Sequence, residues 1–533
     1  MKKHVRSALI LGAIGGFVTF LFGGWSVAVL GVVIGIAIGL TLGSQVKRKD
    51  FLSTALEALP TAATAAGIFL ALSLFQNYVV APATGNYPSP LGMTIVADLA
   101  GSLGLILLAM VITGFHSLSP SGERIGKLIV IAALVIAFPF VDYFTELRWT
   151  AQIIFALIFV ILGLGLNIVV GFAGLLDLGY AAFFAIGAYT TGLLSSTGSI
   201  LYFNYHILLN FWLVIWIAAV VAAISGILLG TPTLPLRGDY LAIVTLGFGE
   251  IIPVVFRNLI DVTIKEPLTC WILPGLIRLF GGSPNITCIT FLSHEDITAG
   301  EKGINPISRP SLPLIGEFQS DNPIIWYFLI IAIILLSVFL IRRLRDSRLG
   351  RAWMAIREDE LAAAQMGINP VRTKLLAFSM GATFSGFAGA FYAAYIRGIF
   401  PGVFDFSVSI IVLVTIILGG LGNINGVIVG GLIIMTADRL FLPALKDFLK
   451  GLMDHSILPA LASHPGVQAA VAQNANPILY RFLLFGLTLV IMMAVRPEGL
   501  IPSEQIREEL HAEENEPAPA GATAPAIESG TPR

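Results

Sequence analysis

Long apolar runs repeat along almost the whole sequence, and they constrain the fold more than any other feature. A run of about 20 apolar residues is long enough to cross the hydrocarbon core of a bilayer as a helix. Hydrophobic side chains make up 56% of the 533 residues and charged ones only 12%, whereas soluble domains carry about 25% charged residues. The sequence therefore predicts an all-α, polytopic transmembrane helical bundle with roughly 11 to 14 membrane segments.

The apolar runs divide into 14 candidate spans, and the Gly-rich ones among them can be broken or re-entrant. Basic residues flank a first hairpin, residues 7–43, on both sides and crowd the segment 342–374. The positive-inside rule therefore places both termini and residues 342–374 in the cytoplasm and the loop 258–322 outside. The spans after the hairpin are expected at about residues 54–80, 91–114, 126–144, 150–170, 180–197, 207–230, 241–257, 323–341, 374–396, 405–420, 426–441 and 478–495.

The outer loop holds the two cysteines of the chain, Cys270 and Cys288. They either form a disulfide, because the outside of a bacterial membrane is oxidising, or remain two free thiols. Two cysteines exclude a disulfide framework or a zinc cluster, and we expect no bound metal or cofactor. Residues 503–533 are acidic and then rich in Ala, Pro and Glu, which predicts a disordered cytoplasmic tail. The net charge of −1 and the scattered basic residues give no sign of a nucleic-acid partner.

Several polar residues fall inside the apolar runs, where such side chains are costly unless they have a function or a partner. They either line a substrate pathway or pack at helix interfaces. For the glutamate among them a local ion pair with Arg257, two helical turns later, is a further option. The candidate pathway residues are Asn167, Asp177, Tyr180, Tyr189 and Glu250.

Glycines spaced four apart lie along one face of a helix and permit close helix packing. Gly31, Gly35 and Gly39 predict such a contact, and so do Gly426 and Gly430. The Gly-rich run 419–426 is interpreted as a turn rather than an anion site.

A polar island at residues 346–370 interrupts the apolar pattern. Acidic residues are followed by Ala362 to Ala364, then by Gly367 and Pro370, which predicts a short helix outside the membrane that stops at the glycine. Small residues on such a helix permit close approach to another protein. The alternative is a solvated connector between two spans.

This island resembles a known docking loop. Ala362, Ala363 and Gly367 match the Ala-Ala-x-x-x-Gly part of the EAA loop by which ABC importer permeases engage their ATPase subunits, although Leu361 stands where that motif has Glu. The chain is more closely similar to the LivM family of branched-chain amino acid permeases. This resemblance rests on residues 164–189, 236–252, 357–369, 419–426 and 496–500.

The resemblance implies a permease subunit of an ABC importer in the bacterial inner membrane, translocating branched-chain amino acids that a periplasmic binding protein delivers. It also implies a second, LivH-like permease and two ATP-binding cassette subunits, which use ATP that this chain does not bind. Residues 151–502 would form the permease domain, with 342–374 as its coupling loop, and residues 1–150 a membrane-embedded extension. The residues expected at the ATPase contact are Arg357, Glu360, Ala362, Ala363 and Gly367.

Other functions fit the sequence less well. No catalytic residues stand out, and the segment 122–128 lacks the glycine spacing and the Ser or Thr of a phosphate loop, so we expect no ATPase activity in this chain. Similar permeases serve urea, amides or other small polar solutes. An ion-coupled secondary transporter is a further alternative, against which the EAA-like loop argues.

Overall fold

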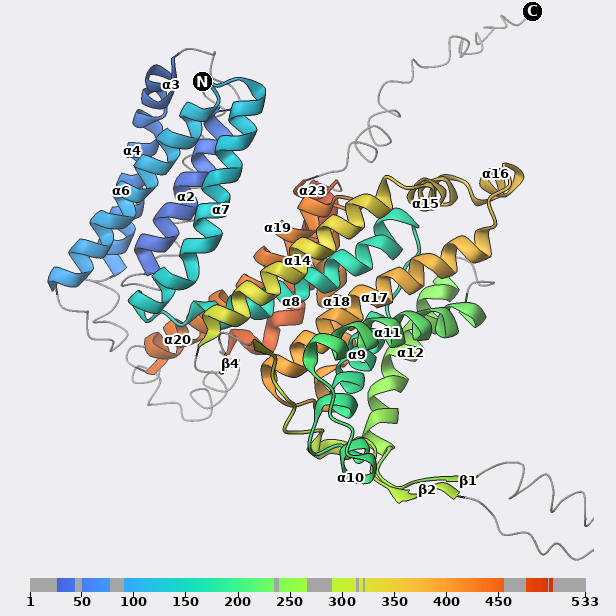
Figure 1. Cartoon of the computed structure of the whole chain (residues 1–533). Coiled ribbons are helices and arrows are strands. Elements are labelled where there is room, and N and C mark those ends of the chain that lie inside the picture. Colours follow the sequence, from blue (N-terminus) through green and yellow to red (C-terminus); the bar gives the residue numbers. More distant parts are fainter. Residues whose placement is uncertain are drawn as a thin grey trace, which may run out of the picture.

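The fold is almost entirely helical (Figure 1). The computed structural model describes residues 26–43, 50–76, 91–233, 239–265, 290–312, 316–319, 322–454, 476–496 and 498–501. Within these ranges nine helices are long and apolar enough to cross a membrane, or up to 10 if one bent pair counts as a span. The predicted class, a polytopic helical membrane protein, is confirmed. The predictions for Cys270, Cys288 and residues 503–533 lie outside the described residues.

The described helices coincide with the predicted spans from the second half of the first hairpin onward, and two short antiparallel sheets lie in the predicted outer loop. The helices are α2 (Ser26–Gly43), α3 (Phe51–Glu57), α4 (Leu59–Phe75), α6 (Leu91–Phe115), α7 (Pro120–Thr145), α8 (Trp149–Asn167) continued by the π-helical turn η2 (Ile168–Phe172), α9 (Tyr180–Ser195), α10 (Ile200–Tyr205), α11 (Phe211–Thr233), α12 (Asp239–Asn258), η4 (Gly300–Lys302), α14 (Pro323–Arg345), α15 (Arg348–Glu358), α16 (Glu360–Gln365), α17 (Pro370–Ile396), η5 (Pro401–Val403), α18 (Phe406–Gly419), α19 (Ile424–Thr436), η6 (Ala437–Phe441), α20 (Leu442–Leu452), η8 (Pro477–Tyr480) and α23 (Arg481–Val495). The strands are β1 (Val262–Lys265) paired with β2 (Thr290–Glu295), and β3 (Ser311–Leu312) paired with β4 (Gly316–Glu317).

The N-terminal helices have a small core of their own around Phe69. A side chain at Gly31 would place its Cβ 2.3 Å from the carbonyl oxygen of Gly101, and one at Gly35 would lie 2.4 Å from that of Leu105. Backbones that approach this closely leave no room for a side chain, so the predicted glycine contact is confirmed, with α6 as the partner of α2.

The larger core belongs to helices α8, α9, α11, α14, α17, α18 and α19, and α8 lies buried among them. A Cβ at Gly430 in α19 would lie 2.4 Å from the Thr415 carbonyl oxygen in α18, which confirms the second predicted glycine contact. Between these helices the chain turns with positive φ at Gly420 and Gly422, as the turn interpretation requires.

Loops that the predicted threading places on the same side of the membrane are joined by hydrogen bonds in the structure. At one end the Arg342 guanidinium donates to the Asn425 side chain over 3.2 Å, so the α14 terminus lies beside the α18–α19 turn. At the other end, the Ser308 amide donates to the Ser195 carbonyl and the Ile304 amide to the Ile399 carbonyl. Figure 1 shows α15 and α16 at the opposite end of the molecule from α10, β1 and β2.

A buried carboxylate at the end of α7 binds the start of α8, where the N-terminal helices meet the larger core. Asp142, near the end of α7, accepts hydrogen bonds from the Trp149 amide (2.9 Å), the Thr150 amide (2.8 Å) and the Thr150 hydroxyl (2.5 Å). The first amides of a helix have no partner within it, and a carboxylate there also interacts favourably with the helix dipole. Asp142 therefore fixes the start of α8 against α7.

Replacing this cap tests its contribution. We expect Asp142→Ala to lower the free energy of unfolding by about 1–2 kcal/mol, the usual cost of losing an N-terminal cap. Asp142→Asn should recover only part of the loss, because its amide oxygen replaces one accepting oxygen while its NH2 group faces a donor at the other. Thermal unfolding of the purified protein in detergent measures the effect. The control is Asp346→Ala, which removes an exposed carboxylate that contacts Arg345 at the surface. Equal melting temperatures for the two alanine variants would contradict the role of Asp142.

Candidate functional site

One span of the bundle is broken. After η2 the chain leaves the helix, runs without regular structure through residues 173–179, and enters α9 at Tyr180. The 16 residues of α9 rise about 24 Å, less than the roughly 30 Å of the hydrocarbon core. The Tyr180 hydroxyl donates to the carbonyl of Gly381, near the middle of α17, so α9 begins deep in the bundle. The predicted Gly-rich span is therefore a broken one.

The non-helical segment and the first turn of α9 are held by hydrogen bonds to three elements, η2, α12 and α18. The Leu175 amide donates to the Val169 carbonyl over 3.0 Å. The Leu178 amide donates to the Thr245 hydroxyl of α12 over 3.1 Å, and the Ala181 amide to the Ser409 hydroxyl of α18 over 3.0 Å. Non-helical backbone at membrane depth occurs where protein or a cavity covers it.

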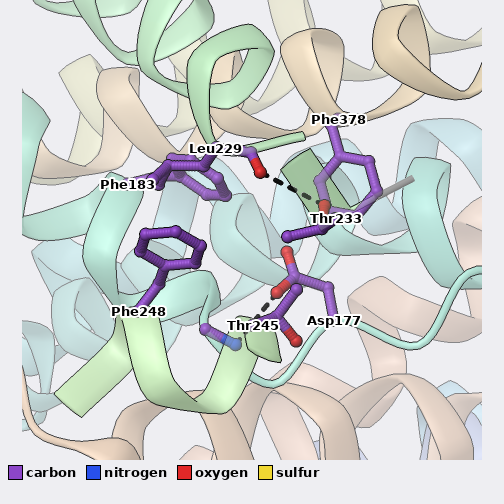
Figure 2. Close-up of a pocket in the computed structure, with 8 residues that line it drawn as sticks. Asp177, Phe183, Leu229, Thr233, Thr245, Phe248 and Phe378 are labelled. Atoms are coloured by element: carbon purple, nitrogen blue, oxygen red, sulfur yellow. Dashed lines mark hydrogen bonds between the residues drawn. The ribbon is translucent and has the colours of Figure 1, made fainter. Parts of the chain in front are cut away.

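Asp177 lies in this segment and is 1% exposed. Its Oδ1 accepts from the Gly179 amide over 2.9 Å, while its Oδ2 has no hydrogen-bond partner among the described residues. Figure 2 shows the carboxylate at the edge of a small cavity, with Phe183 and Phe248 on one side and Phe378 on the other. The cavity volume is about 10 Å³, close to the space that one water requires. This conformation therefore leaves no room for an amino acid beside Asp177.

The helix α12 touches the broken segment through glycine. A Cβ at Gly179 would lie 2.0 Å from the Thr245 carbonyl oxygen, and one at Gly249 would lie 3.0 Å from Gly179 Cα. Thr245 also lines the cavity. A displacement of α12 therefore changes the surroundings of Asp177 directly.

Three of the predicted pathway residues make contacts away from the cavity. Asn167 is fully buried, and its Oδ1 accepts from the Gly422 amide in the α18–α19 turn over 2.9 Å. Tyr180 ties α9 to α17, as described above. Tyr189 stacks on Phe256 of α12 with ring centroids 3.9 Å apart. The structure thus brings Asp177 to the cavity and gives these three side chains contacts between helices.

Glu250 lies on α12 next to Gly249 but on the exposed side of the helix. The local pairing with Arg257 is wrong: the Arg257 guanidinium lies 2.6 Å from the Glu301 carboxylate in the predicted outer loop. A sequence spacing of seven residues could not reveal a partner 44 positions away.

The polar island forms two short helices at one end of the bundle, α15 and α16. The α15 helix is anchored by buried Trp353, whose indole donates to the Thr373 carbonyl over 2.8 Å. The α16 helix is capped by Asp359, which accepts from the amides of Leu361 and Ala362, and it ends before Gly367, whose φ is +86°. The predicted glycine stop is confirmed, but the structure divides the predicted helix in two at Asp359.

The five predicted contact residues separate into two groups. Glu360 pairs with buried Lys374 at 2.7 Å, Arg357 donates to the Gly171 carbonyl over 2.7 Å, and Ala363 is 5% exposed. These three side chains hold the two helices onto the bundle. Ala362 and Gly367 are exposed, together with Leu361 at 69% and Met366 at 84%. Leu361 and Met366 were missed in the sequence, although apolar residues within a polar island were the signal for them.

A multi-pass helical membrane protein with a central span broken around a buried carboxylate has the architecture of a transport protein, in which discontinuous helices line solute sites. Within the described residues no group of His, Cys, Asp and Glu could hold a metal ion. A family model described as "Branched-chain amino acid transport system / permease component" matches residues 150–492. The chain belongs to this family of membrane permeases.

Individual relatives agree with the family. The chain is 37% identical over 383 residues to the high-affinity branched-chain amino acid transport system permease protein LivM of Escherichia coli K12, covering 70% of this chain and 75% of that protein. The LivM protein of Salmonella typhimurium is 35% identical over 398 residues, with the same coverage. The permease protein LivH of Salmonella typhimurium is 32% identical over 135 residues, which are 25% of this chain and 42% of LivH. No solved structure matches the chain.

The close approach at Gly179 is testable. We expect Gly179→Ala to lower the free energy of unfolding by about 1–3 kcal/mol, since the added methyl group meets a backbone carbonyl that can move only with α12. Thermal unfolding in detergent measures the loss. The matched control is Gly67→Ala in α4, where an added Cβ meets none of the described atoms within 4 Å. If both variants unfold at the wild-type temperature, the contact between α12 and the broken segment is not tight.

Proposed function

We propose that this chain is the membrane-spanning permease subunit of an ABC importer of branched-chain amino acids in the inner membrane of a bacterium. The observation that carries the proposal is the family match over residues 150–492. The LivM relatives, which are named for high-affinity branched-chain amino acid transport, support this substrate class. Urea, amides or other small polar solutes remain the alternative cargo.

The proposed complex has a second permease, two ATP-binding subunits and a periplasmic amino-acid-binding protein. Similarity to LivH supports a second permease that shares part of this fold. Separate ATPase subunits are supported by the segment 122–128, which forms the start of α7, capped by the Ser119 hydroxyl, rather than a phosphate loop.

The exposed tip of α16 is the proposed ATPase contact. Leu361, Ala362, Met366 and Gly367 are exposed residues without charge on an element that the predicted threading places in the cytoplasm. Apolar side chains of this kind lose contact with water when they enter a groove on another protein. Arg357, Glu360 and Ala363 serve the same contact indirectly, by fixing α15 and α16 to the bundle.

Asp177 and Glu250 are the proposed pathway residues. Asp177 is buried at the break in the span, and it would become accessible when α12 moves away from Gly179. Asn167, Tyr180 and Tyr189 support the pathway by holding the surrounding helices together.

A reconstituted complex tests the substrate and the energy source. Proteoliposomes that contain this chain, the second permease and the ATPase subunits should accumulate leucine when ATP and the binding protein are supplied. Isoleucine and valine should compete, and urea should not. The purified chain alone should hydrolyse no ATP. Competition by urea without competition by valine would favour urea or a similar solute as the substrate. ATP hydrolysis by the isolated chain would refute the proposal that separate subunits hydrolyse ATP.

Substitutions at the tip of α16 test the docking surface. Met366→Glu places a charge in the proposed contact, and we expect it to weaken association with the ATPase at least tenfold, since a lost interface anchor commonly costs about 2 kcal/mol. Uptake should fall while the amount of protein in the membrane stays constant. The measurement is co-purification of the ATPase subunit with the tagged permease.

A matched pair of glycines supplies the control. Gly367 and Gly316 have similar φ values, +86° and +80°, and a Cβ at either meets none of the described atoms within 4 Å. Gly316 lies in the outer loop. Gly367→Arg should lose the ATPase and Gly316→Arg should retain it. Retention by both arginine variants would show that α16 is only a connector.

A further inference from the structure

The outward face of α12 combines a carboxylate with apolar residues. Glu250 is exposed, and so are Tyr240, Ile243, Ile251 and Val254 on the same side of the helix. At 1.5 Å per residue, Glu250 lies about 16 Å from the first residue of α12 and about 12 Å from the last. The carboxylate is therefore near the middle of the span, too far from either interface for its short side chain to reach water along the helix.

The described part of the chain does not neutralise this carboxylate. None of the described residues forms an ion pair or a hydrogen bond with Glu250. Arg257, the nearest basic residue along α12, is already paired with Glu301 at 2.6 Å. An ionisable side chain facing lipid at this depth is costly, and such residues instead face a bundle interior or a water-filled cavity. Protein or water therefore covers this face of α12 in the assembled transporter.

The helix surface beside Glu250 carries no bulky side chain at Gly247. Gly247 is one helical turn earlier on the same face, and a Cβ there would meet none of the described atoms within 4 Å. Ile243, Ile251 and Val254 add exposed aliphatic side chains on the same face. A carboxylate beside aliphatic groups matches two parts of a branched-chain amino acid, namely its ammonium group and its side chain.

We propose that Glu250 binds the α-ammonium group of the translocated amino acid, in a passage whose other wall is the second permease subunit. This inference rests on the proposed function and names the group of the substrate that Glu250 recognises. The opposite face of α12 packs on Gly179 beside Asp177, so the helix that contacts the substrate also contacts the broken span.

Removing the charge without changing the shape is the first test. In proteoliposomes with the complete complex, Glu250→Gln should reduce the rate of leucine uptake at least tenfold, while the second permease and the ATPase still co-purify. Wild-type leucine uptake by the Glu250→Gln complex would overturn this inference and leave the proposed function intact. Failure of the wild-type complex to transport leucine would instead overturn both. Loss of the second permease from the Glu250→Gln complex would show that the carboxylate pairs with a basic residue of that subunit, which also contradicts the inference.

Thiol accessibility gives an independent test. In a chain with Cys270→Ser and Cys288→Ser, we expect Glu250→Cys in the assembled complex to react with a water-soluble cationic methanethiosulfonate. Leucine delivered by the binding protein should slow the reaction at least threefold. The matched control is Val220→Cys, an exposed mid-span position on α11, which should face lipid and stay unreactive. An unreactive Glu250→Cys, or one that leucine does not protect, would contradict a substrate passage at this face.

Discussion

Backbone groups that leave a helix at membrane depth need partners inside the protein, because lipid offers none. In residues 173–179 the Thr245 hydroxyl of α12 accepts from the Leu178 amide and the Asp177 carboxylate from the Gly179 amide. The Ser409 hydroxyl of α18 accepts from the Ala181 amide in the first turn of α9. The positions of these two helices around the break follow from those hydrogen bonds. The absence of a side chain at Gly179 then lets α12 come close enough for the Thr245 hydroxyl to reach the Leu178 amide.

The same break is joined by Arg357 to α15, the helix that precedes the proposed docking tip on α16. The Arg357 guanidinium donates to the Gly171 carbonyl, and its aliphatic part lies so close to Gly174 that a Cβ there would be 2.8 Å from Arg357 Cγ. Gly174 has a φ of +70°, where a side chain would also strain the backbone. The end of α15 is therefore in direct contact with the segment that carries Asp177, and a shift of α15 is transmitted there without an intervening element.

Prediction from the sequence succeeded where a property is local. The length of an apolar run, the glycines spaced four apart and the glycine that ends α16 each depend on a few neighbouring residues. Prediction of the site was less complete. Asn167, Tyr180 and Tyr189 belong to the same Gly-rich block as Asp177, yet their partners lie in the α18–α19 turn, in α17 and in α12. Nothing in their spacing encodes those distant partners.

The sequence by itself determined that the chain is a multi-pass helical membrane protein, which segments cross, and where a short helix interrupts the crossings. Apolar length and turn chemistry act within a few residues, so they can be read without coordinates. Only the tertiary structure decided that Asp177 is enclosed while Glu250 is exposed, and that Ala363 is buried while Met366 projects from the bundle. Burial is set by which helices pack against each face, and those helices come from distant parts of the chain.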